Sequence, residues 1–77
     1  MKADWVVVVD LAPKGATNRV NRALRDLGFT EVMPFVFISR FGLLDEGRLR
    51  SAIRRARKGA VGNVLACPVA SGEPFRW

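Results

Sequence analysis

The feature that most constrains this fold is an apolar run near the N-terminus, Trp5 to Leu11, interrupted only by Asp10. Its four consecutive valines are β-branched, and the run has the length of a strand. An apolar run without polar alternation is typical of a central strand that is covered on both faces. Because Pro13 and Gly15 follow, we expect this strand to end shortly after its single carboxylate.

The next segment has the spacing of an amphipathic helix over residues 17–27. Either Thr17 or Asn18 can cap its first turn by accepting a hydrogen bond from a free backbone N–H, and Gly28 is suited to ending it. The apolar positions recur at i, i+4 and i+7, which predicts one buried stripe made of Val20, Leu24 and Leu27.

A second helix is predicted over residues 46–58, with Asp45 as its N-cap and with Gly59 and Gly62 ending it. Its inner face is predicted to consist of Leu49, Ala52, Ile53 and Ala56. Most of its other positions are basic, namely Arg48, Arg50, Arg54, Arg55, Arg57 and Lys58.

The remaining segments have the composition of strands. Residues 29–41 are rich in β-branched and aromatic side chains, but Pro34 cannot occupy a ladder position of a central strand, so either one bent strand or two short strands fit. Residues 63–69 form a last apolar strand, in which Cys67 is expected to be a small core residue.

This order predicts an α+β domain with a ferredoxin-like β-α-β-β-α-β arrangement over residues 1–70, followed by a tail at 71–77. Its antiparallel sheet would carry two helices on one face and leave the other face open. With 49% hydrophobic residues in a chain of 77, we expect that open face to be covered in a homodimer.

The composition limits the chemistry. The chain has a formal charge of +6, and most of its 13 cations are arginine, which binds phosphate through two donors. One cysteine and no histidine exclude an internal disulfide and histidine-based catalysis, and they suit a cytoplasmic protein. No apolar run is long enough to span a membrane.

The cations of the two helices are the candidate phosphate ligands. No carboxylate lies between Glu46 and Glu73, so the cations that follow Glu46 in the second helix have no acid among them, and either nucleic-acid phosphates or an acidic protein partner would relieve their charge. In the alternative interpretation these helix faces are only solvated, with an Arg22–Asp26 pair at i, i+4. The predicted nucleic-acid contacts are Lys14, Asn18, Arg19, Arg22, Arg25, Arg50, Arg54, Arg55, Arg57 and Lys58.

Four segments together resemble the small CRISPR-associated adaptation protein, a dimeric subunit that bridges integrase dimers and was historically described as an endoribonuclease. They are Val-Val-Asp-Leu at 8–11, the basic segment 19–29, Val-Met-Pro-Phe-Val-Phe at 32–37, and 62–69 with the Ser-Gly-Glu-Pro-Phe that ends at residue 75. The resemblance implies a non-catalytic, duplex-DNA-binding subunit of the spacer acquisition complex. It also implies that the last strand and the tail dock onto the integrase or a neighbouring subunit through Val64, Leu65, Phe75, Arg76 and Trp77.

The role of Asp10 distinguishes the non-catalytic interpretation from an enzymatic one. In the family, matching acids of two chains face each other and are proposed to hold a divalent cation, so Asp10 could bind Mg²⁺ in a metal-dependent endonuclease acting on RNA or DNA. Alternatively, Asp10 only caps the turn that follows it. Its position just before an arginine-rich helix predicts a carboxylate beside a cationic surface.

A third possibility is a stand-alone RNA-binding domain of the same fold. Phe35, Phe37 and Phe41 alternate and could stack bases from one face of the sheet, although their packing in the core or in a dimer is the favoured interpretation.

Overall fold

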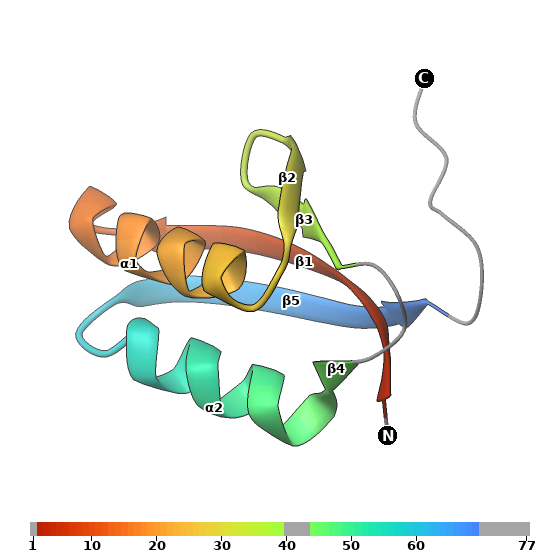
Figure 1. The fold of residues 1–77 in the computed structure, drawn as a ribbon. Helices are drawn as coiled ribbons and strands as arrows, with labels where there is room; N and C mark the ends of the chain where they lie inside the picture. Colours follow the sequence, from red (N-terminus) through yellow and green to blue (C-terminus); the bar gives the residue numbers. More distant parts are fainter. Residues whose placement is uncertain (1, 40–43, 70–77) are drawn as a thin grey trace.

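The computed structural model describes residues 2–39 and 44–69, and these residues form one sheet with two helices (Figure 1). The elements in chain order are β1 (Lys2–Ala12), α1 (Lys14–Asp26), β2 (Thr30–Met33), β3 (Val36–Ile38), β4 (Leu44–Asp45), α2 (Glu46–Ala56) and β5 (Val61–Val69). The predicted α+β class and the β-α-β-β-α-β order are confirmed, with the two-residue β4 as an addition.

The main sheet has the strand order β2-β3-β1-β5, and every neighbouring pair is antiparallel. As predicted, β1 is central. It pairs with β3 through Val6 to Val8 and with β5 along the whole stretch from Asp4 to Ala12, while its first residues pair with β4. Among the described strands, β5 pairs only with β1 and therefore forms an edge of the sheet.

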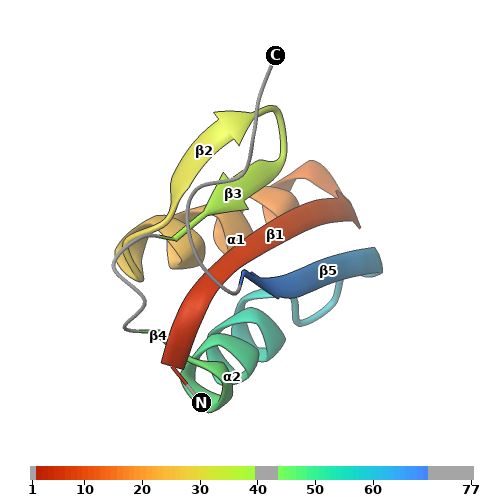
Figure 2. The same cartoon turned by 90° about the vertical axis from the view of Figure 1, so that its right-hand side faces the viewer.

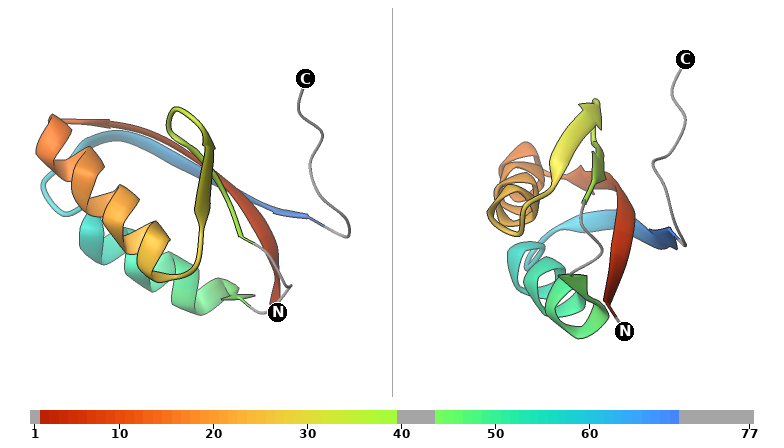
Figure 3. Two further views of the ribbon diagram at one scale, coloured as in Figure 1. Left: turned by 45° about the horizontal axis from the view of Figure 1, so that its top comes forward. Right: turned by 45° about the vertical axis from the view of Figure 1, so that its right-hand side comes forward.

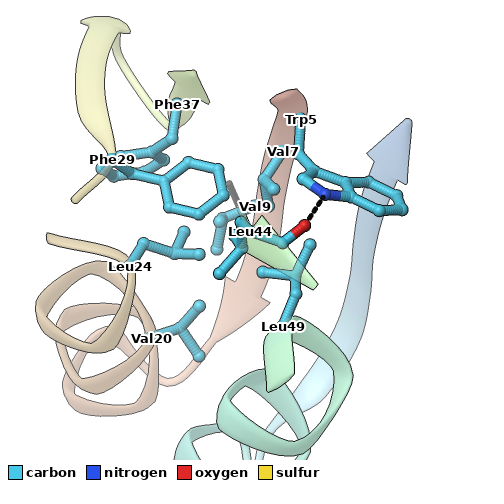
Figure 4. Packing of buried hydrophobic residues seen from close by; sticks show 9 residues of the cluster. All are labelled: Trp5, Val7, Val9, Val20, Leu24, Phe29, Phe37, Leu44 and Leu49. Carbon is cyan, nitrogen blue, oxygen red and sulfur yellow. Dashed lines mark hydrogen bonds between the residues drawn. The ribbon is translucent and has the colours of Figure 1, made fainter. Parts of the chain in front are cut away.

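Both helices cover the same face of the sheet (Figures 2 and 3). The core explains why, because alternate residues of β1 point to one side and meet apolar residues of α1 and α2 there (Figure 4). The indole Nε1 of Trp5 also donates a hydrogen bond to the Leu44 carbonyl oxygen at 3.2 Å. The fully or nearly buried members of this core are Trp5, Val7, Val9, Val20, Leu24, Phe29, Phe37, Leu44 and Leu49.

The other face of β1 is not covered by a helix, so the prediction of a strand covered on both faces is wrong for the described chain. Val6, Val8 and Asp10 point to this face, where Val8 is 37% exposed. Leu65 of β5 lies directly opposite Val8 and is 61% exposed. Two helices on one side protect only every second residue of the strand, and we call the uncovered side the open face.

Helix α1 begins three residues earlier than predicted. Pro13 is its N-cap and makes no side-chain hydrogen bond, but its carbonyl oxygen accepts from the N–H groups of Ala16 and Thr17. The prediction of Thr17 or Asn18 as the cap is therefore wrong, and the Thr17 hydroxyl instead donates to the Leu11 carbonyl oxygen at 2.8 Å. Gly28, with φ of +96°, follows the helix as expected.

Helix α2 begins as predicted. The Asp45 carboxylate accepts from the backbone N–H groups of Gly47 at 2.9 Å and of Arg48 at 3.4 Å. The hydrogen bond from the Arg48 N–H is the main cause that lowers the pKa of Asp45 below its ordinary value, and the bond from the Gly47 N–H acts in the same direction. The helix ends at Ala56, two residues before the predicted end, and Gly62 lies within β5 rather than at the helix end.

Residues 30–38 form two short strands and a turn, which settles the choice between one bent strand and two. Pro34 lies in that turn, and Phe35 has a left-handed φ of 65°. Phe37 is buried within β3, whereas Phe35 lies in the turn and is 48% exposed, and Phe41 lies outside the described residues. Cys67 is exposed on the open face opposite Val6, so its prediction as a core residue is wrong.

Neither of the helices in the described part of the chain is long and apolar enough to cross a membrane.

Candidate functional site

Asp10 lies on the open face of the sheet, at the end of β1 and opposite Asn63 of β5. The arginine-rich helices cover the other face. The prediction of a carboxylate beside the cationic surface is therefore wrong, because the sheet separates the two. Sequence proximity to α1 was misleading, since an odd or even position along a strand decides the face on which a side chain lies.

Asp10 is exposed, and its side chain makes no hydrogen bond or ion pair within the described residues. Hence it does not cap the following turn there. Among the described residues no group of three or more His, Cys, Asp or Glu side chains comes together. A single carboxylate does not fit a protein magnesium site well, so a metal at Asp10 would need ligands from a second chain.

Two of the predicted phosphate ligands are engaged with the backbone. Arg19 of α1 donates from Nε to the Ala56 carbonyl oxygen at 3.3 Å and from Nη2 to that of Lys58 at 3.0 Å. Arg57 donates from Nη2 to the Gly62 carbonyl oxygen at 2.8 Å. Arg19 therefore holds the end of α2, where the last carbonyl oxygens of a helix lack partners within it, whereas Arg57 joins that end to β5.

Two other arginines form exposed ion pairs. Arg25 contacts Glu31 at 3.0 Å, and Arg50 contacts Glu46, one helical turn away, at 2.9 Å. Glu31 also accepts from the N–H of Phe35 at 3.0 Å and thereby joins α1 to the β2–β3 turn. Exposed pairs of this kind contribute little to stability, so both arginines can exchange a carboxylate for a phosphate at low cost.

Six further cations whose side chains the structure describes have no carboxylate partner among the described residues. The expected Arg22–Asp26 pair is absent from this part of the chain. Asn18 is also exposed on α1. Apart from Arg19, which bonds to the backbone, these exposed cations are Lys14, Arg22, Arg48, Arg54, Arg55 and Lys58.

The cations of α2 divide into two rows. Arg48 and Arg55 line a shallow groove of about 300 Å³ against α1, which also includes Asp26. These two exposed arginines define what we call the helix-layer surface. Arg48 is absent from the predicted contacts, although its spacing of seven residues from Arg55 indicates the same helix face.

The second row points toward the edge strand. Arg50, Arg54 and Arg57, at i, i+4 and i+7, line a groove of about 510 Å³ between α2 and β5. The sequence pattern grouped all the α2 cations together, whereas the tertiary packing assigns them to opposite sides of one helix.

The predicted docking residues of β5 lie on opposite faces of the sheet. Leu65 belongs to the open face, while Val64 is opposite Val9 on the helix-covered face and is half-buried. Phe75, Arg76 and Trp77 lie outside the described residues.

Comparisons of the chain with protein-family models, with curated protein sequences and with solved structures gave no match.

Proposed function

We propose that this protein is a non-catalytic, duplex-DNA-binding subunit with a ferredoxin-like fold. The observation that carries the proposal is the helix-layer surface, where Arg48 and Arg55 are exposed, line the same groove and have no ion-pair partner among the described residues. Adjacent guanidinium groups repel one another, and phosphate oxygens relieve that repulsion through paired hydrogen bonds.

The second part of the proposal is a homodimer formed through the open face. Val8 and Leu65 lie side by side there and are 37% and 61% exposed. Burying apolar area of this kind is favourable by roughly 25 cal/mol per Å², which supports a second copy of the chain as the cover. Such a dimer would carry one helix-layer surface on each outer side and so could bridge two segments of DNA or two partner proteins.

The bridging role in CRISPR spacer acquisition rests on the resemblance of the four sequence segments. The strand order β2-β3-β1-β5, with both helices on one face, supports the ferredoxin-like part of that resemblance. An integrase would be the partner, docked at β5 and the tail.

A magnesium-dependent endonuclease is the second candidate, because Asp10 shares the open face with Val8 and Leu65. A two-fold dimer through that face would bring two Asp10 carboxylates toward each other, which one chain alone cannot do. Asp10→Ala separates the candidates, since cleavage of RNA or DNA in magnesium would be lost in an enzyme, whereas duplex binding would persist in a scaffold.

The proposal is tested by fluorescence anisotropy with a labelled DNA duplex over a range of salt concentrations. The double variant R48A/R55A is compared with R50A/R54A, which removes the same charge from the opposite side of the same helix. We expect R48A/R55A to weaken binding about tenfold and to reduce the salt slope by about 2, because each lost phosphate contact removes about 0.9 from it. Equal loss in the two variants would contradict a specific surface, and a wild-type protein that ignores duplex would refute the proposal.

A further inference from the structure

The groove between α2 and β5 combines an apolar floor with a basic rim. Leu49 and Ile53 of α2 and Val64 and Ala66 of β5 contribute to the floor, together with Trp5 of β1. Along the rim stand Arg50, Arg54 and Arg57, against the one carboxylate of Glu46. The groove therefore offers apolar contact and an excess of positive charge in one place.

The hydrogen-bonding direction of the β5 backbone follows from the register of the sheet. The Val9 N–H donates to the Phe35 carbonyl oxygen, and the Ser39 N–H donates to the Trp5 carbonyl oxygen, so the backbone groups of Trp5 and Val9 point toward β3. Because backbone direction alternates along a strand, those of Val6, Val8 and Asp10 point toward β5. Their partners Cys67, Leu65 and Asn63 are thus the residues of β5 that bond to β1.

The intervening residues of β5 point their backbone groups outward, beside the groove. Val64 and Ala66 each point an N–H and a C=O outward there. Within residues 2–39 and 44–69, these outward groups have no hydrogen-bond partner. Two neighbouring residues agree with this direction. Pro68 has no N–H and occupies an outward position, and the Gly62 carbonyl oxygen accepts from Arg57, the residue that follows α2.

We propose that β5 and this groove bind an extended, acidic segment of a partner protein by strand addition. The segment's backbone would pair with Val64 and Ala66, and every second side chain, being apolar, would enter the groove. Its carboxylates would meet Arg54, which has no carboxylate partner among the described residues, and Arg50, whose exposed pair with Glu46 is exchangeable. The inference rests on the proposed role of β5 as a partner-docking strand and adds the chemistry of the partner.

Two other occupants are less well matched. Pairing of β5 with β5 of a second copy would bring two rows of arginines toward each other, and a row of positive charge along an edge opposes such self-pairing. Nucleic acid would leave the apolar floor and the outward N–H groups of Val64 and Ala66 without partners, since a phosphate backbone lacks alternating donors and acceptors at strand spacing.

The test uses a labelled synthetic peptide of alternating valine and glutamate, with an otherwise identical valine–lysine peptide as the control. Binding to the full chain is measured by fluorescence anisotropy, and amide hydrogen exchange is followed by NMR. We expect the acidic peptide to bind, the basic peptide to fail, and the amides of Val64 and Ala66 to gain protection on binding. Ala66→Pro should abolish binding while leaving the fold intact, because its N–H is not used by β1 and Pro68 is already accommodated in the same register.

The two double variants of the duplex-DNA experiment also serve as controls for peptide binding. R50A/R54A should weaken peptide binding about tenfold and R48A/R55A should leave it unchanged, the reverse of the result expected for duplex DNA. Normal duplex binding without peptide binding would overturn this inference alone. Binding without protection of Val64 and Ala66 would also overturn it, as would duplex DNA displacing the peptide, or protection of those amides by a second copy at high protein concentration.

Discussion

The guanidinium of Arg19 in α1 donates to the carbonyl oxygen of Lys58, 39 positions later in the chain, at 3.0 Å. It also donates to the Ala56 carbonyl oxygen, so one side chain links α1 to the end of α2. Arg19→Ala should therefore lower the free energy of unfolding by about 1 kcal/mol, the usual net value of such a hydrogen bond. Urea unfolding measures the change. Arg22→Ala, three positions along the same helix, is the control and should change stability by less than about 0.5 kcal/mol.

Gly62 is packed against the backbone of β1. A Cβ at this position would overlap the Asp10 carbonyl oxygen, and the φ of +114° is strained for any other residue. Gly62→Ala should cost more than about 2 kcal/mol, which thermal and urea unfolding would detect. Gly15→Ala is the matched control, because a Cβ added there would meet nothing within 4 Å and alanine favours the helix. A tolerated Gly62→Ala would contradict the close approach of β5 to β1.

The N-cap Asp45 should make stability depend on pH. Hydrogen bonds from the backbone N–H groups of Arg48 and Gly47 lower its pKa in the folded state below the ordinary value of an aspartate. Its contribution is therefore fully present above the unfolded pKa and is lost as the pH falls through the lower folded value. Asp45→Asn keeps a cap but removes this titration, so its melting temperature should fall less than that of the wild type between neutral and strongly acidic pH. Parallel acid-induced losses in both proteins would be evidence against the cap as the titrating group.

Phe35 is exposed in a left-handed conformation that normally favours glycine. Phe35→Gly should raise stability, by up to about 1 kcal/mol, because it removes the strain of a left-handed bulky residue. Phe37→Ala, two residues away but fully buried, should instead cost about 3–5 kcal/mol. Chemical denaturation of the two variants compares these opposite signs directly, and a destabilised Phe35→Gly would mean that the exposed ring packs favourably.

The open face supplies a test of the proposed homodimer. Leu65→Glu places a charge where Leu65 is 61% exposed, so the fold of one chain should persist while the dimer dissociates. Sedimentation velocity measures the oligomeric state, and circular dichroism checks the fold. Lys58→Ala, at an exposed position after α2, lowers the net charge by the same one unit and controls for the change of charge. A wild-type protein that sediments as a monomer would refute the dimer.

The sequence alone determined the local structure wherever backbone preference, apolar spacing or helix capping allows a segment only one role. The valine run predicted a central strand, the spacing of Val20 and Leu24 predicted a buried helix stripe, and Asp45 predicted the start of α2. Pro34 likewise predicted an interruption of the second strand region, where the structure has the β2–β3 turn. Each of these follows from backbone preferences or apolar periodicity, which act over a few residues.

Only the tertiary structure decided which polar groups share a surface. Asp10 is close to α1 in sequence, yet the two-residue period of β1 places it on the face away from the helices. In the sequence Arg19 is one exposed cation among others, but in the folded chain it bonds to the carbonyl oxygen of Lys58. Arg50 and Arg55 are likewise equivalent in the sequence, but Arg50 lines the groove against β5 and Arg55 the groove against α1. Contacts between residues distant in sequence depend on how the elements pack, and neither composition nor periodicity contains that information.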